Sequence, residues 1–243
     1  RPEYSYLAAD LTRAYNNNRH DEMGEDGKVS EVVRQLLYLR DSDQLVVYDK
    51  VRTSDPTYTP KWLLHTINKP QLDATRVLVG APDNGILESR EKQLLVTNGI
   101  GRLRVDTLYP ENSLIRLVGG PDYQFYVEQD GDDSTLDGRN MVQGVDRRPW
   151  FDESRWRVEI QPGTKSRENH FLIAMTPSLE QFRASAAEVL QTSGTACHGS
   201  RIGTNLVLFP EAPESGSLSL NRVASDHVLY LAGIAPRARI RLG

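Results

Sequence analysis

The sequence of 243 residues contains a single cysteine, Cys197. One cysteine excludes a disulfide within the chain, and no base motif stands beside it, so a nucleophilic role is not expected. No run of about 18 apolar residues occurs, which argues against a membrane span. The net charge of −4 comes without a clustered basic excess. Nucleic acid is therefore not an expected partner, although a local basic patch can still bind a polyanion.

Helical periodicity is also scarce, and short β-rich runs take its place. Turn residues separate these runs every 8–12 residues or so, and Asn98-Gly99 is the strongest hairpin signal. About fifteen strands without crossover helices predict an all-β, antiparallel sandwich with at most one short helix. The main predicted strands are 4–12, 29–39, 44–51, 61–66, 76–79, 91–97, 101–109, 113–118, 124–127, 156–160, 171–175, 205–209, 217–220, 227–231 and 238–242.

The one predicted helix covers residues 178–190. Ser178 can act as its N-cap, Glu180 lies near the first turn, and apolar residues recur at helical spacing, although the last residues could equally begin a strand. We expect residues 1–177 to form the main β domain and residues 178–243 to complete it or to be appended to it. The chain starts at Arg1 without a signal peptide, which suits a processed form or a piece of a longer protein.

The segment from Lys61 to Pro70 is the first candidate for a functional role. Trp62-Leu63-Leu64-His65 is a β-type run that ends on a histidine just before a polar turn. Such a strand brings an imidazole to the edge of a sheet, where it can transfer protons or bind a metal. The alternative is a packed or solvent-facing histidine without a role.

Several motifs, in their order along nearly the whole chain, resemble the β-sandwich region of heparinase II/III-like polysaccharide lyases. Each motif alone is weak, but the succession is fairly specific. The motifs lie at residues 6–15, 44–51, 62–65, 101–105, 108–110, 118–125, 156–160, 171–175, 206–209 and 231–236.

This resemblance implies a supersandwich of antiparallel sheets that follows an N-terminal (α/α) toroid in the full enzyme. It also implies cleavage of acidic polysaccharides at uronic acids by β-elimination, in which a base removes the C5 proton and an acid protonates the leaving oxygen. The toroid, which would supply the main base, is not in this sequence, so we expect the chain alone to be inactive. His65 is the histidine that the resemblance assigns to the sandwich.

A divalent metal, zinc or similar, is also implied by the resemblance. Its expected ligands are His65, Asp83 and Asp122, because imidazole and carboxylate suit such an ion. Asp122 stands near a position where the family usually has a histidine. Asp83 and Asp122 could instead be ordinary turn residues.

Substrate binding is expected from two further regions. Tyr15 and Asn16 could stack on and hydrogen-bond to sugar rings, unless they belong to an ordinary polar loop. Arg147 and Arg148, together with Arg155 and Arg157, flank Trp150 and Trp156 and suit carboxylated or sulfated sugars. The remaining histidines have no partners at useful spacing and are expected to be structural; they are His20, His170, His198 and His227.

Three functions remain open at this point. The first is the sandwich part of a uronate-specific lyase, with an acidic polysaccharide and a toroid domain or chain as partners. The second is a non-catalytic carbohydrate-binding or scaffolding module. The third, a mutarotase-like enzyme, needs an acid–base pair around one sugar ring, and only His65 is available. A polymer substrate implies a secreted or periplasmic protein.

Overall fold

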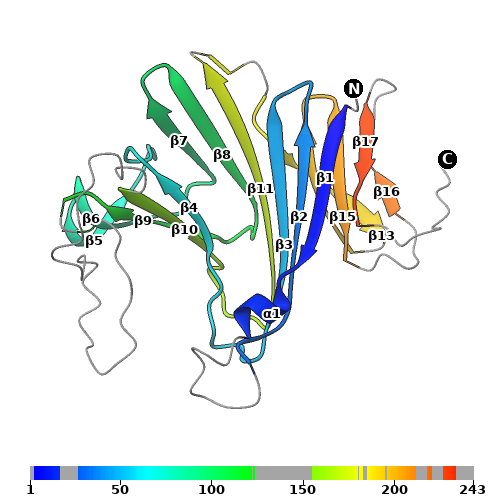
Figure 1. The fold of residues 1–243 in the computed structure, drawn as a ribbon, viewed down its shortest axis with the longest axis horizontal. Coiled ribbons are helices and arrows are strands. Elements are labelled where there is room, and N and C mark those ends of the chain that lie inside the picture. Colours follow the sequence, from blue (N-terminus) through cyan, green and yellow to red (C-terminus); the bar gives the residue numbers. More distant parts are fainter. Residues whose placement is uncertain are drawn as a thin grey trace.

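The computed structural model describes residues 3–16, 27–121, 123, 155–179, 181–182, 185–194, 196–211, 218–220 and 227–233. Over these residues the chain is all-β, as predicted, with a single short helix, α1 (Thr12–Tyr15). No helix among them is long and apolar enough to cross a membrane. Figure 1 shows the sheets arranged side by side along the longest axis of the molecule.

Two large antiparallel sheets contain most of the chain. The six-stranded sheet has the order β1 (Tyr4–Asp10), β2 (Val29–Leu39), β3 (Gln44–Thr53), β11 (Glu168–Leu179), β8 (Gly101–Tyr109) and β7 (Gln93–Asn98). The five-stranded sheet has the order β4 (Trp62–Thr66), β10 (Trp156–Gln161), β9 (Leu114–Gly119), β6 (Asn84–Ser89) and β5 (Arg76–Ala81).

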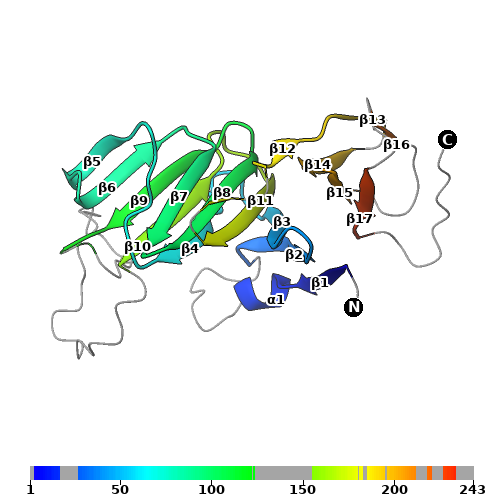
Figure 2. The same ribbon diagram turned by 90° about the horizontal axis from the view of Figure 1, so that it is seen from above.

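The C-terminal part of the chain forms two smaller sheets. One has four strands in the order β12 (Glu188–Val189), β14 (Cys197–Ile202), β15 (Asn205–Pro210) and β17 (Val228–Leu231). The other pairs β13 (Thr192–Gly194) with β16 (Leu218–Leu220). Every described ladder is antiparallel except β15–β17, which is parallel. Figure 2 shows these small sheets at the opposite end of the molecule from β5 and β6.

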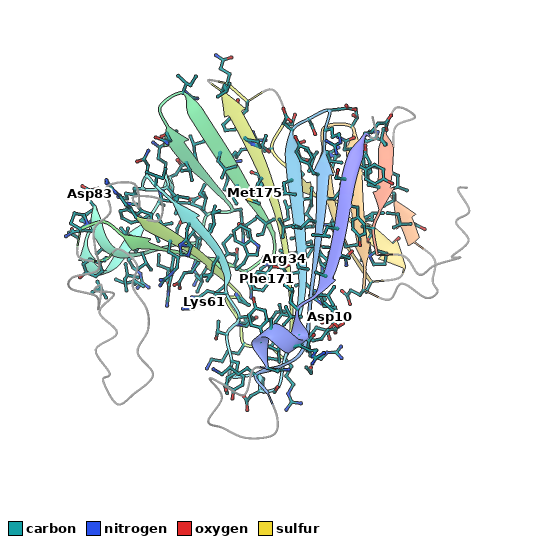
Figure 3. All side chains as sticks on the ribbon, in the orientation of Figure 1. Asp10, Arg34, Lys61, Asp83, Phe171 and Met175 are labelled. Carbon is teal, nitrogen blue, oxygen red and sulfur yellow. The ribbon has the colours of Figure 1, made fainter. Side chains whose placement is uncertain are left out.

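The middle of the six-stranded sheet, formed by β3, β11 and β8, is buried on both faces, whereas the edge strand β1 is mostly exposed. The buried middle makes this sheet the central layer of the sandwich. Strand β11 shows this best, because its successive residues enter different cores. Phe171 and Ile173 pack with the five-stranded sheet, whereas Leu172 and Ala174 pack with β14 and β15. Two-sided burial also explains why this run is continuously apolar instead of alternating. Figure 3 shows Phe171 on this central strand.

The predicted hairpins are confirmed in the described residues. Strands β2 and β3 pair as an antiparallel hairpin, and β7 and β8 meet around Asn98-Gly99. Gly99 has φ of 59°, a left-handed conformation that glycine adopts without strain. The sequence pattern did not predict β6 or the C-terminal strands β12, β13 and β14. The strands predicted at 124–127 and 238–242 lie outside the described residues.

The helix predicted over residues 178–190 is wrong. Ser178 and Leu179 continue β11, where they pair with Arg102 and Gly101 of β8, and Glu188 begins β12. Extension of the β8–β11 ladder outweighs the local helical pattern, since propensity is a weak preference that tertiary pairing overrides. The expected boundary after residue 177 therefore falls inside a strand. Residues on both sides of it share one core, in which Tyr48 stacks on Phe209.

Candidate functional site on the outer face of the five-stranded sheet

Strand β4 presents His65 on the solvent side of its sheet. The strand lies at the sheet edge, and its residues alternate between the two faces. Trp62 and Thr66 are buried toward the central sheet, whereas Leu63 and His65 are exposed. The expectation that this run brings an imidazole to a sheet edge agrees with the structure. No described residue donates or accepts a hydrogen bond at its ring.

Cross-strand pairing places charged residues beside His65 on the same face. Arg157 of β10 is directly opposite His65, and Glu159 is opposite Leu63. The same row continues through β9 and β6, where Glu159 faces Arg116 and Arg116 faces Glu88. Side chains directly opposite one another in a ladder contact each other, so this register creates a continuous charged surface. We call it the outer face; its charged members are Lys61, Arg76, Glu88, Arg116, Arg157 and Glu159.

Glu159 is the most buried charge on the outer face, with a side-chain exposure of 4%. Lys61 Nζ lies 3.0 Å from its Oε2, and Arg157 Nη2 lies 2.6 Å from its Oε1. Burial raises the pKa of Glu159, but Lys61 and Arg157 more than offset this effect and hold the pKa below its usual value. The carboxylate is therefore ionised, and the cluster carries two cations for one anion.

A second cluster repeats this composition further along the outer face. Arg76 Nη2 lies 2.8 Å from Glu88 Oε1, and Arg116 Nε lies 3.5 Å from Glu88 Oε2. Again two cations share one carboxylate. Among the described residues, these two clusters hold four cations and two carboxylates, whereas the whole chain has a net charge of −4. Such a patch attracts anionic ligands in spite of the overall acidity.

The protonation of His65 follows from its surroundings. Partial burial lowers the pKa of His65, and the positive charge of Arg157 lowers it further. The ring is therefore neutral at pH 7. A neutral imidazole can accept a proton through one nitrogen and donate one through the other.

The expected metal set at His65 is not tested by the structure, and two neighbours oppose it. The side chain of Asp83 is 94% exposed, and its Oδ1 lies 3.2 Å from Lys69 Nζ. His65 has the Arg157 cation beside it. Asp122 lies outside the described residues, so this ligand set stays a prediction. Figure 3 shows Asp83 near the outer end of the five-stranded sheet.

The other expected substrate-binding residues do not gather around His65 in the described structure. Tyr15 is exposed in α1, which packs beside β2 of the central sheet. The side chain of Asn16 makes two hydrogen bonds with the backbone of Val29. Its Nδ2 donates to the Val29 carbonyl at 2.7 Å, and its Oδ1 accepts from the Val29 N–H at 3.2 Å. Asn16 therefore fixes the start of β2. These two assignments stay predictions, and Arg147 and Arg148 lie outside the described residues.

The tryptophan that was expected to lie beside sugar rings is part of the core. Trp156 is 5% exposed and packs between the two large sheets. Its neighbour in sequence, Arg157, points the other way because adjacent residues of a strand alternate between faces. Arg157 and Trp156 are therefore neighbours in the sequence but do not form a common surface.

Sequence reasoning missed a group formed by His170, His198 and Glu211. Both histidines were expected to be structural, because no partner stands at a short spacing. In the structure, one potential ligand atom from each residue lies within 4.8 Å of the others. It is the one group of three or more such side chains found among the described residues. The alternation of residues along β11 and β14 could have assigned each histidine to one face of its sheet. Which two sheets contact each other cannot be predicted from the sequence.

Comparisons with known proteins give a distant structural relationship. No family model matches the sequence, and no curated protein matches it either. A crystal structure of heparinase III is similar to this chain, with a TM-score of 0.43 and 10% sequence identity. The matched part covers 86% of this chain and 26% of that chain, so this chain spans about a quarter of the length of the structure that it resembles.

Proposed function

We propose that this chain is the β-sandwich part of a lyase that cleaves uronic-acid-containing polysaccharides by β-elimination. The observation that carries the proposal is the pairing of His65 with Arg157 on an outer face whose described charged members are four cations and two carboxylates. The motifs that resemble heparinase II/III-like lyases along the chain support the same function. A polymer substrate makes the protein a secreted or periplasmic one.

β-Elimination at a uronic acid has three chemical requirements. A cation must neutralise the C5 carboxylate, a base must take the C5 proton, and an acid must protonate the glycosidic oxygen as the bond to C4 breaks. A guanidinium binds a carboxylate through parallel hydrogen bonds, so Arg157 and its neighbouring cations suit the first requirement. The neutral ring of His65 suits a proton-transfer step at the same place.

The main base belongs, in this proposal, to an N-terminal (α/α) toroid that would lie against the outer face. Within the described residues, His65 is the single titratable group of the outer face that is neutral at pH 7. One histidine can act as both base and acid only if it takes the C5 proton and then passes that proton to the glycosidic oxygen. The chain alone is therefore expected to bind the polymer but not to cleave it.

A non-catalytic carbohydrate-binding module is the second candidate. The observation that favours it is the ion pairing of the cations: Arg157 and Lys61 already share Glu159, and Arg76 and Arg116 share Glu88. A paired, rigid charged surface suits binding as well as catalysis. This alternative predicts affinity for the polymer without any unsaturated product.

The experiment that tests the lyase function measures the absorbance of unsaturated uronates on a panel of acidic polysaccharides. It uses the chain alone and the chain together with the sequence encoded directly upstream. We expect product only when the upstream sequence is present. We also expect the His65→Gln variant of the active form to lose about 10²- to 10⁴-fold in kcat, as is usual for a general acid–base residue. His227→Gln, far along the chain, is the matched control and should retain activity.

Three other outcomes would change the assignment. Product from the chain alone would mean that the sandwich carries its own base, which contradicts the toroid-dependent mechanism. Full activity of His65→Gln in the extended form would remove His65 from the chemistry. Polymer binding without product in every form would favour the non-catalytic module.

A further inference from the structure

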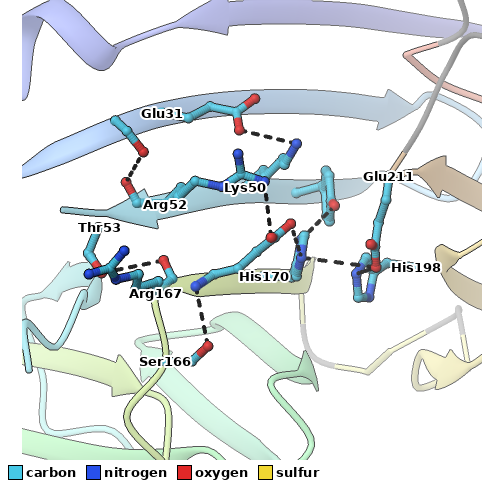
Figure 4. Close-up of polar contacts among 12 residues, drawn as sticks. Glu31, Lys50, Arg52, Thr53, Ser166, Arg167, His170, His198 and Glu211 are labelled. Atoms are coloured by element: carbon cyan, nitrogen blue, oxygen red, sulfur yellow. Dashed lines mark hydrogen bonds and ion pairs between the residues drawn. The ribbon is translucent and has the colours of Figure 1, made fainter. Parts of the chain in front are cut away.

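Three potential metal ligands meet where the central sheet contacts the C-terminal four-stranded sheet. His170 comes from β11 of the central sheet, His198 comes from β14, and Glu211 follows β15 directly. The β14–β15 ladder places His198 opposite Phe209, two residues before Glu211. The Glu211 amide donates a hydrogen bond to the Ala196 carbonyl at 3.0 Å, which fixes its position beside His198. Figure 4 shows the three side chains close together.

The distances within this group are close to those of a coordination sphere. His198 Nε2 lies 2.8 Å from Glu211 Oε1, and His170 Nε2 lies 4.0 Å from the same oxygen. Ligand atoms around a tetrahedral zinc ion are about 3.4 Å apart, given zinc–ligand bonds of about 2.0–2.2 Å. The observed distances lie on both sides of this value, so movements of the side chains would be needed to bring the three atoms to this spacing.

His198 has polar atoms that the described protein leaves unsatisfied. Neither ring nitrogen has a hydrogen-bond partner of good geometry, although both are buried. Glu211 Oε1 is near enough to Nε2 for a hydrogen bond, so only its direction from the ring is unsuitable. Buried nitrogen atoms without partners cost stability, and a ligand at Nε2 would satisfy one of them.

Tyr48 supports the ring of His170 from the other side. Its hydroxyl lies 2.8 Å from His170 Nδ1, and burial raises the pKa of this tyrosine, which keeps the hydroxyl protonated. A hydroxyl can accept as well as donate a hydrogen bond. When Nδ1 carries the proton and donates a hydrogen bond to the Tyr48 oxygen, Nε2 keeps its lone pair, with Glu168 Oε1 at 3.4 Å and Glu211 Oε1 at 4.0 Å. This support for the second nitrogen is usual for metal-binding histidines.

The protonation states in this group also suit a metal. Burial lowers the pKa of His170, and burial together with the neighbouring His170 lowers the pKa of His198 to about 4. Both rings are therefore neutral at pH 7, which is the form that binds a metal ion. Cys197 is adjacent in sequence but is not one of the residues whose ligand atoms lie together, and burial raises the pKa of its thiol to about 11.

We propose that His170, His198 and Glu211 bind one divalent transition-metal ion, best suited to zinc, that links β11 to the β14–β15 hairpin. Two imidazoles and one carboxylate are a common zinc donor set, and water fills the fourth position. The ion would join the central sheet to the C-terminal sheet across their shared core. This proposal is separate from the lyase function and uses none of the residues on the outer face.

Binding also requires a specific rearrangement of the two rings. The rings of His170 and His198 are stacked, with centroids 4.2 Å apart and planes inclined by 30°. Coordination of one ion by Nε2 of each ring needs the rings to splay, since each nitrogen binds in its own ring plane. His198 loses no good hydrogen bond in this movement, and Tyr109, which contacts its ring edge-on, is only partly buried.

The test measures zinc binding by the full chain after removal of metal with a chelator. We expect one zinc ion per chain by titration calorimetry and by elemental analysis after dialysis. Zinc at a hundredfold excess over its Kd should raise the Tm by roughly 5–10 °C, because the ion binds only the folded state. In imidazole NMR spectra, the signals of His170 and His198 should shift with zinc while that of His65 stays unchanged.

Variants separate this site from others. Glu211→Gln and His170→Gln should lose stoichiometric zinc binding, and Tyr48→Phe should weaken it about 10- to 100-fold. His227→Gln is the matched control and should bind zinc like the original protein. Far-ultraviolet circular dichroism checks that each variant is folded. The NMR experiment on the unaltered chain tests the site even if a variant fails to fold.

Two results would overturn the proposal. The first is no zinc binding by the unaltered, metal-free chain at pH 7.5. The second is loss of binding in His65→Gln with retention in Glu211→Gln, which would place the ion at the other ligand set. Neither result bears on the formation of unsaturated uronates, so the two proposals can fail independently.

Discussion

His65 and Arg157 lie directly opposite each other on the outer face, in the ladder between β4 and β10. This relationship puts a positive charge next to an imidazole that has no anionic partner among the described residues. Arg157 is itself held by Glu159, so its position is fixed from the other side. A fixed cation beside a neutral imidazole suits a proton-transfer step next to a bound carboxylate.

Replacement of Arg157 should raise the pKa of His65. Burial and Arg157 both lower this pKa, so Arg157→Gln removes one of the two causes and moves the pKa back toward 6.5. Arg157→Lys keeps the charge and is the control. The measurement is an NMR titration of the imidazole protons. An unchanged His65 pKa in Arg157→Gln would show that the guanidinium does not act on the ring.

Glu159→Gln should destabilise the protein at neutral pH. The substitution removes the buried carboxylate that Lys61 and Arg157 share, and loss of one partner from such a buried ion pair costs on the order of 3 kcal/mol. Glu188→Gln, whose carboxylate pairs with Arg201 in solvent, is the matched control and should change stability by less than about 0.5 kcal/mol. Urea unfolding at pH 7 measures both.

The same carboxylate predicts a pH dependence of stability. The pKa of folded Glu159 is below its ordinary value of 4.5, so its contribution is fully present above that value and is lost as the pH falls through the folded pKa. Glu159→Gln should therefore flatten the acid side of the stability profile below about pH 4.5. An equally steep loss in the variant would assign the acid sensitivity to other groups.

Polymer binding should depend on the cations of the outer face and on salt. Arg76→Gln removes an exposed positive charge and should weaken binding of a uronic-acid polymer roughly two- to fivefold, the usual size of one solvent-exposed charge interaction. Added salt should reduce this difference. Arg201→Gln removes a comparably exposed cation from the four-stranded sheet and is the control. Equal effects of the two substitutions would mean that the outer face is not the binding surface.

The C-terminal sheet should unfold together with the central sheet. Phe209 is fully buried, stacks on Tyr48 and belongs to a core shared by both sheets. Phe209→Ala should therefore destabilise the whole protein by about 3–5 kcal/mol within a single cooperative transition. Two separate transitions, with only the smaller one shifted, would indicate that residues 178–243 are an appended unit.

The sequence by itself determined the all-β class, most strands and the place of His65 at a sheet edge. These features follow from local rules: the strand period of two, the Asn98-Gly99 turn and the absence of crossover helices. The same rules failed at residues 178–190, where a helical pattern became part of β11 because β8 offered a partner.

Only the tertiary structure decided which distant residues meet. The pairing of β4 with β10 placed Arg157 beside His65 on the outer face, and it placed Trp156 on the opposite face, in the core. The contact between the central and C-terminal sheets brought His170, His198 and Glu211 together. Contacts of this kind depend on sheet order and layer packing, which strand periodicity along the chain does not encode.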